Sequence, residues 1–208
     1  MGLKLTVMLP DTFYHVFNHA NGDENLFREE KNYYFFLEKW TKYIEPVANT
    51  YAYCLMPNHI HFLIKTKTAT DVTSNLKFAE DLPFGKFGTF QKVVSKQFSN
   101  LFSSYAQAYN KLYNRRGSLF IPNFKKKEID NPDYLKSVIN YIHQNPVHHG
   151  FRDRPEEWPY SSYDAFFNIK RTRLQREEVL SWLGGKEAFE KYHQSEILPD
   201  DVSVLIDY

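Results

Sequence analysis

The sequence YAYCLMPNHIHFLI, residues 51–64, is the part of the chain that decides the fold. Two apolar runs flank a short Met-Pro-Asn connection, which predicts two strands, residues 50–55 and 59–65, joined as an antiparallel hairpin. Side chains alternate between the faces of a strand, so His59, His61 and Leu63 share one face and Ile60, Phe62 and Ile64 share the other.

Outside this hairpin, the spacing of apolar residues and the positions of Gly and Pro predict the remaining elements. The predicted order is a strand at 12–17, a helix at 28–44, the hairpin, a loop at 66–88, a helix at 90–114, an extended segment at 119–126 and a helix at 132–145.

The last of these helices has clear ends. Asn131 suits the N-cap and Pro132 the first turn, and Pro146 disfavours continuation beyond Asn145. We expect residues 158–163 to pack back on the core and two short helices to lie around Gly184-Gly185.

The order strand, helix, two strands, helix, helix predicts an α+β sandwich, with an antiparallel sheet and helices on one face. A length of 208 residues is enough for one well-buried domain and a small appendage. We expect the main domain at residues 1–170 and a small helical C-terminal extension at 171–208.

Composition narrows the class of protein. Apolar residues make up 42% of the chain and charged residues 25%, as in globular proteins, while the 17% of aromatic residues suits both a core and platforms for unpaired bases. The one cysteine, Cys54, excludes an internal disulfide and a cysteine-based zinc site, and it should be buried. The absence of a membrane-length apolar run and of a secretory signal predicts a cytoplasmic protein with no membrane partner.

The net charge of +1 hides an uneven distribution. Residues 82–127 contain nine basic residues and no acidic one, so the rest of the chain carries a net charge of −8. The basic residues are Lys86, Lys92, Lys96, Lys111, Arg115, Arg116, Lys125, Lys126 and Lys127. This asymmetry favours a nucleic-acid partner over the alternative, a solvated basic helix face, which does not explain the missing acidic residues.

Two motifs carry possible chemistry. His59 and His61 lie close enough to share a metal ion, although such pairs also arise by chance on surface strands. Tyr141 and Asn145, four residues apart, lie on one helix face. If that helix crosses the sheet near the hairpin, Asn145 could offer an amide oxygen to the metal, one turn from Tyr141. The alternative is that Tyr141 is an ordinary core residue.

These segments resemble a known family. Residues 51–64 resemble the His-hydrophobic-His strand of single-tyrosine transposases of the HUH class, and YIHQNPVHHG, residues 141–150, resembles their catalytic helix and its exit. Residues 14–16 and 158–163 also match. The Tyr-x-x-x-Asn-Pro pattern at 141–146 is typical of the REP-associated tyrosine transposases. The last 40 or so residues of the chain resemble nothing in that family.

The resemblance implies a ferredoxin-like sandwich and an HUH transposase catalytic domain at 1–170. It also implies that His59, His61 and Asn145 bind Mg²⁺ or Mn²⁺, although the wider family often has Gln where Asn145 stands. Tyr141 would attack single-stranded DNA at hairpin-flanked sites and form a 5′-phosphotyrosine. We expect seven residues to hold the DNA: Lys92, Lys96, Arg115, Arg116, Lys125, Lys126 and Lys127.

No Gly-rich phosphate loop with its Lys is present, so no nucleotide cofactor is expected. The REP-associated branch resembles a monomer and shorter relatives are dimers; we favour a monomer acting at the nucleoid and leave a dimer open.

Three rival functions remain: a replication-initiator or relaxase-like nicking enzyme, a non-catalytic DNA-binding protein derived from a transposase, and a small His-x-His hydrolase of nucleotides. A covalent protein–DNA adduct would separate the transposase function from the last two of these rivals.

Overall fold

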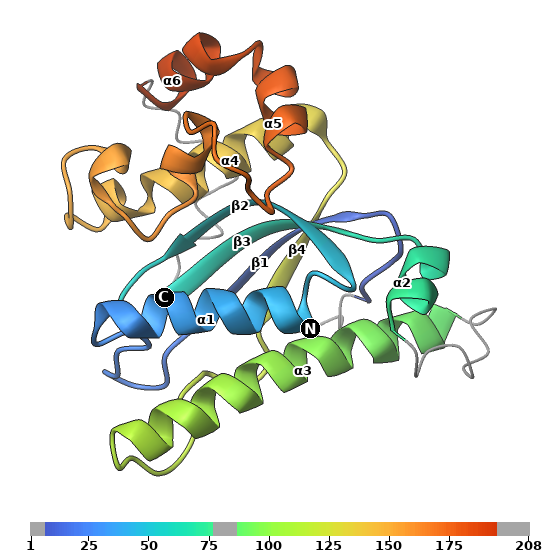
Figure 1. Cartoon of the computed structure of the whole chain (residues 1–208), viewed down its shortest axis with the longest axis vertical. Coiled ribbons are helices and arrows are strands. Elements are labelled where there is room, and N and C mark those ends of the chain that lie inside the picture. The colour runs from blue at the N-terminus through green and yellow to red at the C-terminus, as the bar shows by residue number, and fades with distance from the viewer. Residues whose placement is uncertain (1–6, 77–86, 195–208) are drawn as a thin grey trace, which may run out of the picture.

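The computed structural model describes residues 7–76 and 87–194 (Figure 1). Four strands form one sheet in the order β2-β3-β1-β4, and every neighbouring pair is antiparallel. The strands are β1 (Phe13–His19), β2 (Ala48–Leu55), β3 (His59–Thr66) and β4 (Lys125–Ile129). The predicted hairpin corresponds to β2 and β3, and the predicted antiparallel α+β fold with ferredoxin-like strand order is confirmed.

Helices cover both faces of the sheet (Figure 1). On one face lie α1 (Glu30–Tyr43) and α3 (Phe87–Leu112), where Trp40 stacks on Phe62 with ring centroids 3.5 Å apart. On the other face lies α4 (Pro132–His148), with α5 (Arg176–Leu183) and α6 (Lys186–Gln194) outside it. The prediction that the helices share one face is therefore wrong. Strand β3 is buried on both sides except at Lys65, so each face needs apolar cover.

Two further predictions need correction. The segment expected to be a loop at 66–88 contains a short helix, α2 (Ala69–Asn75). Thr68 caps this helix by accepting a hydrogen bond from the Asp71 amide at 3.1 Å. Residues 77–86 lie outside the described part. Helix α4 continues through Pro146 to His148. Proline removes one donor near the helix end, and the His149 amide still bonds the Asn145 carbonyl at 3.0 Å, so the last turn survives.

Segments after α4 fasten that helix to the sheet. The predicted packing of residues 158–163 is confirmed, since Trp158 Nε1 donates to the Leu55 carbonyl at 3.0 Å and the Ser162 amide donates to the Tyr53 carbonyl at 2.9 Å. The two predicted C-terminal helices are α5 and α6; residues 195–208 lie outside the described part. Cys54 is fully buried, as expected. Among the described helices, none has the length and apolar character to cross a membrane.

A buried chain of hydrogen bonds joins α6, α4 and the sheet. The His193 Nδ1–H donates to the Phe189 carbonyl at 2.8 Å, so its Nε2 accepts from His143 Nδ1 at 2.9 Å. The Nε2 atom of His143 in turn accepts from the Ser162 hydroxyl at 2.7 Å, and that hydroxyl accepts from the Tyr53 amide at 2.8 Å. With both imidazoles neutral, each N–H and O–H of this chain faces one acceptor.

Acid should therefore weaken the attachment of α6. Burial lowers the pKa of His193 to about 4, whereas an unfolded histidine takes up its proton near the ordinary value of 6.5. Unfolding therefore binds a proton at pH values between these two. The free energy of unfolding consequently falls as the pH is lowered through this range. Lowering the pH from about 7 to about 5 should cost the wild-type protein about 2 kcal/mol more than it costs His193→Gln. Urea unfolding at both pH values measures the difference, and equal losses in the two proteins would contradict this assignment.

Candidate active site

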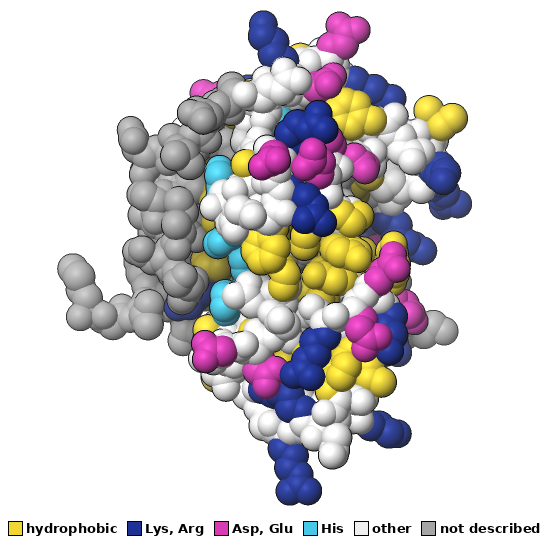
Figure 2. Space-filling view, turned by 90° about the vertical axis from the view of Figure 1, so that its left-hand side faces the viewer, with side chains coloured by type: hydrophobic (Ala, Val, Ile, Leu, Met, Phe, Trp, Pro, Cys, Tyr) yellow, Lys and Arg dark blue, Asp and Glu magenta, His cyan; other side chains and the backbone are white. Residues whose placement is uncertain are grey.

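The two predicted histidines lie under α4, in a cluster that extends onto β1. In the sheet register His19 stands opposite His59 and Phe17 opposite His61. The rings of His19 and His59 are stacked with centroids 5.5 Å apart, and His15 stacks on His61 at 5.1 Å. Figure 2 shows histidine side chains reaching the surface along this side of the molecule. Sequence reasoning missed His15 and His19, since only strand pairing brings them to the hairpin.

Helix α4 brings the predicted amide ligand to His59. Asn145 Nδ2 donates to the Tyr141 carbonyl one turn earlier at 3.0 Å, which fixes the orientation of the amide. Its Oδ1 atom consequently faces His59 and lies 3.1 Å from His59 Nε2, while Nδ1 of the same ring lies 2.8 Å from Asn58 Oδ1. Two segments far apart in the chain thus place an imidazole nitrogen and an amide oxygen side by side.

One of the two tautomers of His59 suits the binding of a cation by this pair. Burial lowers the pKa of His59 to about 4, so the ring is neutral at pH 7 and has one N–H. When Nδ1–H donates to Asn58, the Nε2 lone pair and Asn145 Oδ1 face each other as two acceptors. A divalent ion near both would remove that repulsion. Imidazole nitrogen and amide oxygen fit Mg²⁺ or Mn²⁺ as part of a ligand set completed by phosphate and water oxygens.

One ring nitrogen of His61 lies within hydrogen-bond distance of His15. Its Nδ1 lies 3.0 Å from Nε2 of His15, which is fully buried. Burial lowers the pKa of His61 well below its ordinary value and that of His15 to about 3, so both rings are neutral and one proton joins them. A proton on His61 Nδ1 leaves Nε2 with the lone pair that a metal ligand needs. Within the described residues, no three His, Cys, Asp or Glu side chains are placed to hold one ion.

Tyr141 lies against these rings. Its ring meets His61 edge-on with centroids 5.5 Å apart and His15 at 6.0 Å, and 5% of the side chain is exposed. Burial raises the pKa of Tyr141 to about 12, while hydrogen bonding with Asn145 opposes the shift. The phenol is therefore protonated at pH 7, and in that form it is only a weak nucleophile.

The structure gathers two of the predicted DNA-binding residues at the site. Lys127 pairs with His15 and Lys125 with Phe17 across β1 and β4, so both lysines share the face of the histidines. Lys126 lies on the opposite face, and burial lowers its pKa. The two lysines therefore form a basic row beside Tyr141.

The other predicted DNA-binding residues lie elsewhere. Lys92 and Lys96 are exposed on α3, across the sheet from the histidines. Arg115 closes the turn after α3: its Nε donates to Glu24 at 2.8 Å and its Nη2 to the Ser118 carbonyl at 2.9 Å. Arg116 is exposed in the same turn. The seven predicted residues thus lie in separate places, on β4, on α3 and in the turn after α3.

The chain is similar to proteins of one known family. No family model matches the chain. A Haemophilus influenzae protein named REP-associated tyrosine transposase is 28% identical to this chain over 114 residues. These residues make up 55% of this chain and 58% of that relative, so the match spans little more than half of the relative's length. The solved structure of a REP-associated tyrosine transposase bound to a REP hairpin matches with a TM-score of 0.56 and 17% identity, over 80% of this chain and 85% of that one. The resemblance to this family that the sequence suggested is confirmed, as is the shared fold.

Proposed function

We propose that the protein is a divalent-metal-dependent transesterase that cleaves and rejoins single-stranded DNA beside hairpins, with Tyr141 as its nucleophile. One observation carries the proposal: His59, His61, Asn145 and Tyr141, from a hairpin and a helix far apart in sequence, converge on one side of the sheet. The relative's name and the hairpin bound in the similar structure support the substrate class.

Each group would have a defined part in the reaction. His59, His61 and Asn145 would hold a divalent ion, which when bound neutralises a scissile phosphate and orients it for in-line attack. The oxygen of Tyr141 forms a bond to phosphorus and the bond from phosphorus to the 3′ oxygen breaks. The phenolic proton passes through solvent to the departing 3′ oxygen. The products are a 5′-phosphotyrosine and a 3′-hydroxyl.

Rejoining needs no other source of energy. The phosphotyrosine keeps one phosphodiester-type bond for each one broken, so attack by the same or another 3′-hydroxyl reverses the step and releases Tyr141. This balance agrees with the absence of a nucleotide-binding loop from the sequence.

The basic row on β4 should contribute to DNA affinity. Lys125→Glu combined with Lys127→Glu should weaken binding of a single strand about tenfold or more at physiological salt, and should lower the salt dependence by about 0.7 for each phosphate that is no longer neutralised. Fluorescence anisotropy at several salt concentrations measures both effects. The matched control is Lys92→Glu with Lys96→Glu, which makes the same charge change on α3. An unaltered salt slope in the β4 variant would show that this row faces away from DNA.

The direct test is a denaturing gel of the protein incubated with Mn²⁺ and labelled single-stranded DNA that carries a hairpin from its own genomic flanks. A labelled band at the mass of the protein is expected, because the phosphotyrosine survives denaturation. Tight binding without such a band would favour a non-catalytic DNA-binding protein that has kept the site, and would overturn the proposed reaction.

A further inference from the structure

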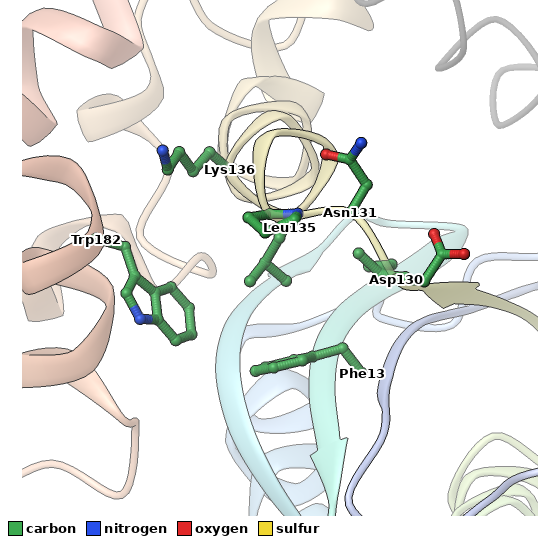
Figure 3. Close-up of a pocket in the computed structure, with 8 residues that line it drawn as sticks. Phe13, Asp130, Asn131, Leu135, Lys136 and Trp182 are labelled. Carbon is green, nitrogen blue, oxygen red and sulfur yellow. The ribbon is translucent and has the colours of Figure 1, made fainter.

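A second feature of the site face is a pocket of about 550 Å³ between β1, the start of α4, and α5 (Figure 3). Phe13, Leu135 and Trp182 form its apolar walls, together with Ile129 and Pro132. Figure 3 shows Leu135 pointing from α4 into the space between Phe13 and Trp182. Asp130, Asn131 and Lys136 bring polar groups to the rim.

The aromatic wall of the pocket is built from rings that pack on one another. Trp182 stacks on Tyr51 with ring centroids 5.2 Å apart and planes 13° apart, and Tyr51 is almost fully buried. Phe13 meets both rings edge-on, at 5.8 Å from Trp182 and 5.0 Å from Tyr51. Trp182 itself stays partly exposed. A buried aromatic support behind a half-exposed indole provides a platform on which a planar ring can stack.

The pocket lies in line with the candidate active site. Phe13, His15 and Phe17 alternate onto one face of β1, so the pocket begins about 7 Å along the strand from His15. Along α4, Leu135 precedes Tyr141 by six residues, a rise of about 9 Å. A strand whose phosphate lies at Tyr141 can therefore reach the pocket with a nearby nucleotide.

The charged side chains between the candidate active site and the pocket suit a polyanion. Ile129, Lys127 and Lys125 alternate onto the same face of β4, so the strand begins at the active site with its two lysines and ends in the wall of the pocket. The side chain of Lys127 lies over the ring of Tyr134 at 4.5 Å. This basic row marks a path for a phosphate backbone from Tyr141 to the pocket.

We propose that the pocket binds an unpaired base of the single-stranded DNA, close to the scissile phosphate, by stacking it on Trp182. The inference rests on the proposed function and adds a site of base recognition to it. The polar rim gives the base edge its partners: Asp130 accepts hydrogen bonds, and Asn131 can donate through Nδ2 because its Oδ1 caps α4 at the Asp133 and Tyr134 amides.

The test combines a change in the protein with a change in the DNA. The probe is a labelled single strand from the hairpin flank, in which each base in turn is replaced by an abasic site, and anisotropy gives its affinity for the full chain. One abasic position near the cleavage site should weaken binding to the wild-type protein about tenfold. The same replacement should cost Trp182→Ala nothing, because its platform is already absent, and Trp182→Phe should restore most of the penalty.

The controls separate this inference from the proposed function. Tyr34 is an exposed aromatic residue on α1, across the sheet, and Tyr34→Ala should keep the wild-type abasic profile. Equal penalties in wild type and Trp182→Ala would overturn the base pocket while single-strand cleavage stands. A loss of self-association in Trp182→Ala, with DNA affinity unchanged, would assign the pocket to a second copy of the chain instead. A wild-type protein that binds no single strand would overturn both proposals.

Discussion

Tyr141→Phe is expected to abolish the covalent protein–DNA adduct and strand cleavage, with a rate loss of about four orders of magnitude or more, because it removes the only oxygen that forms the new bond. Affinity for the hairpin substrate should stay within about twofold, since the phenyl ring keeps its place against His61 and a hydroxyl contributes little to binding. Adduct yield on denaturing gels and anisotropy on the same preparation measure the two quantities.

The matched control is Tyr134→Phe. Tyr134 lies two turns before Tyr141 on α4, and its hydroxyl is buried without a hydrogen-bond partner among the described residues. It is the one other tyrosine on this helix, and its loss should leave cleavage intact. If the adduct survives in Tyr141→Phe and disappears in Tyr134→Phe, the roles of the two residues are reversed.

The second large effect is expected at the metal ligands. His59→Ala and His61→Ala should each lower the affinity for Mn²⁺ by about a hundredfold or more, which exceeds the usual loss for residues that only support a ligand. Cleavage should disappear with the metal. Titration calorimetry with Mn²⁺ and no DNA measures the affinity, so the result does not depend on catalysis.

A control at a histidine of similar burial guards against a general loss of structure. His193→Gln changes a buried imidazole that the proposed metal site does not use, and it should bind Mn²⁺ as the wild type does. Unchanged Mn²⁺ affinity in His59→Ala or in His61→Ala would contradict the proposed set of metal ligands.

Local patterns in the sequence were sufficient to predict the hairpin and the helix that begins at Pro132. Alternation placed His59 and His61 on one face, and the cap at Asn131 fixed the start of α4; the structure has both features. These signals depend on neighbours in the chain, which is why a single sequence reveals them.

The features of the fold and of the site that the sequence did not predict depend on interactions between distant segments. The order of the elements suggested that the helices share one face, whereas the structure shows that β3 is covered on both sides. His15 became part of the site only through its pairing beside β3. Arg115 was predicted to bind DNA from its place in a basic run, and its bond to Glu24, 91 residues earlier, is a contact that the run does not reveal. The pocket at Trp182 needed the position of α5, which no motif predicted.

The lysines of β4 also affect how molecules of this protein meet one another. Strand β4 is the last strand of the sheet, and an edge strand with unpaired backbone groups invites another molecule to extend the sheet. Three consecutive lysines on five residues oppose such growth by like-charge repulsion. Removing their charge with Ala would therefore expose a template for aggregation as well as weaken any binding of DNA, whereas Glu keeps the edge protected. The basic strand should thus oppose sheet-to-sheet association on the same surface that is proposed to draw in DNA.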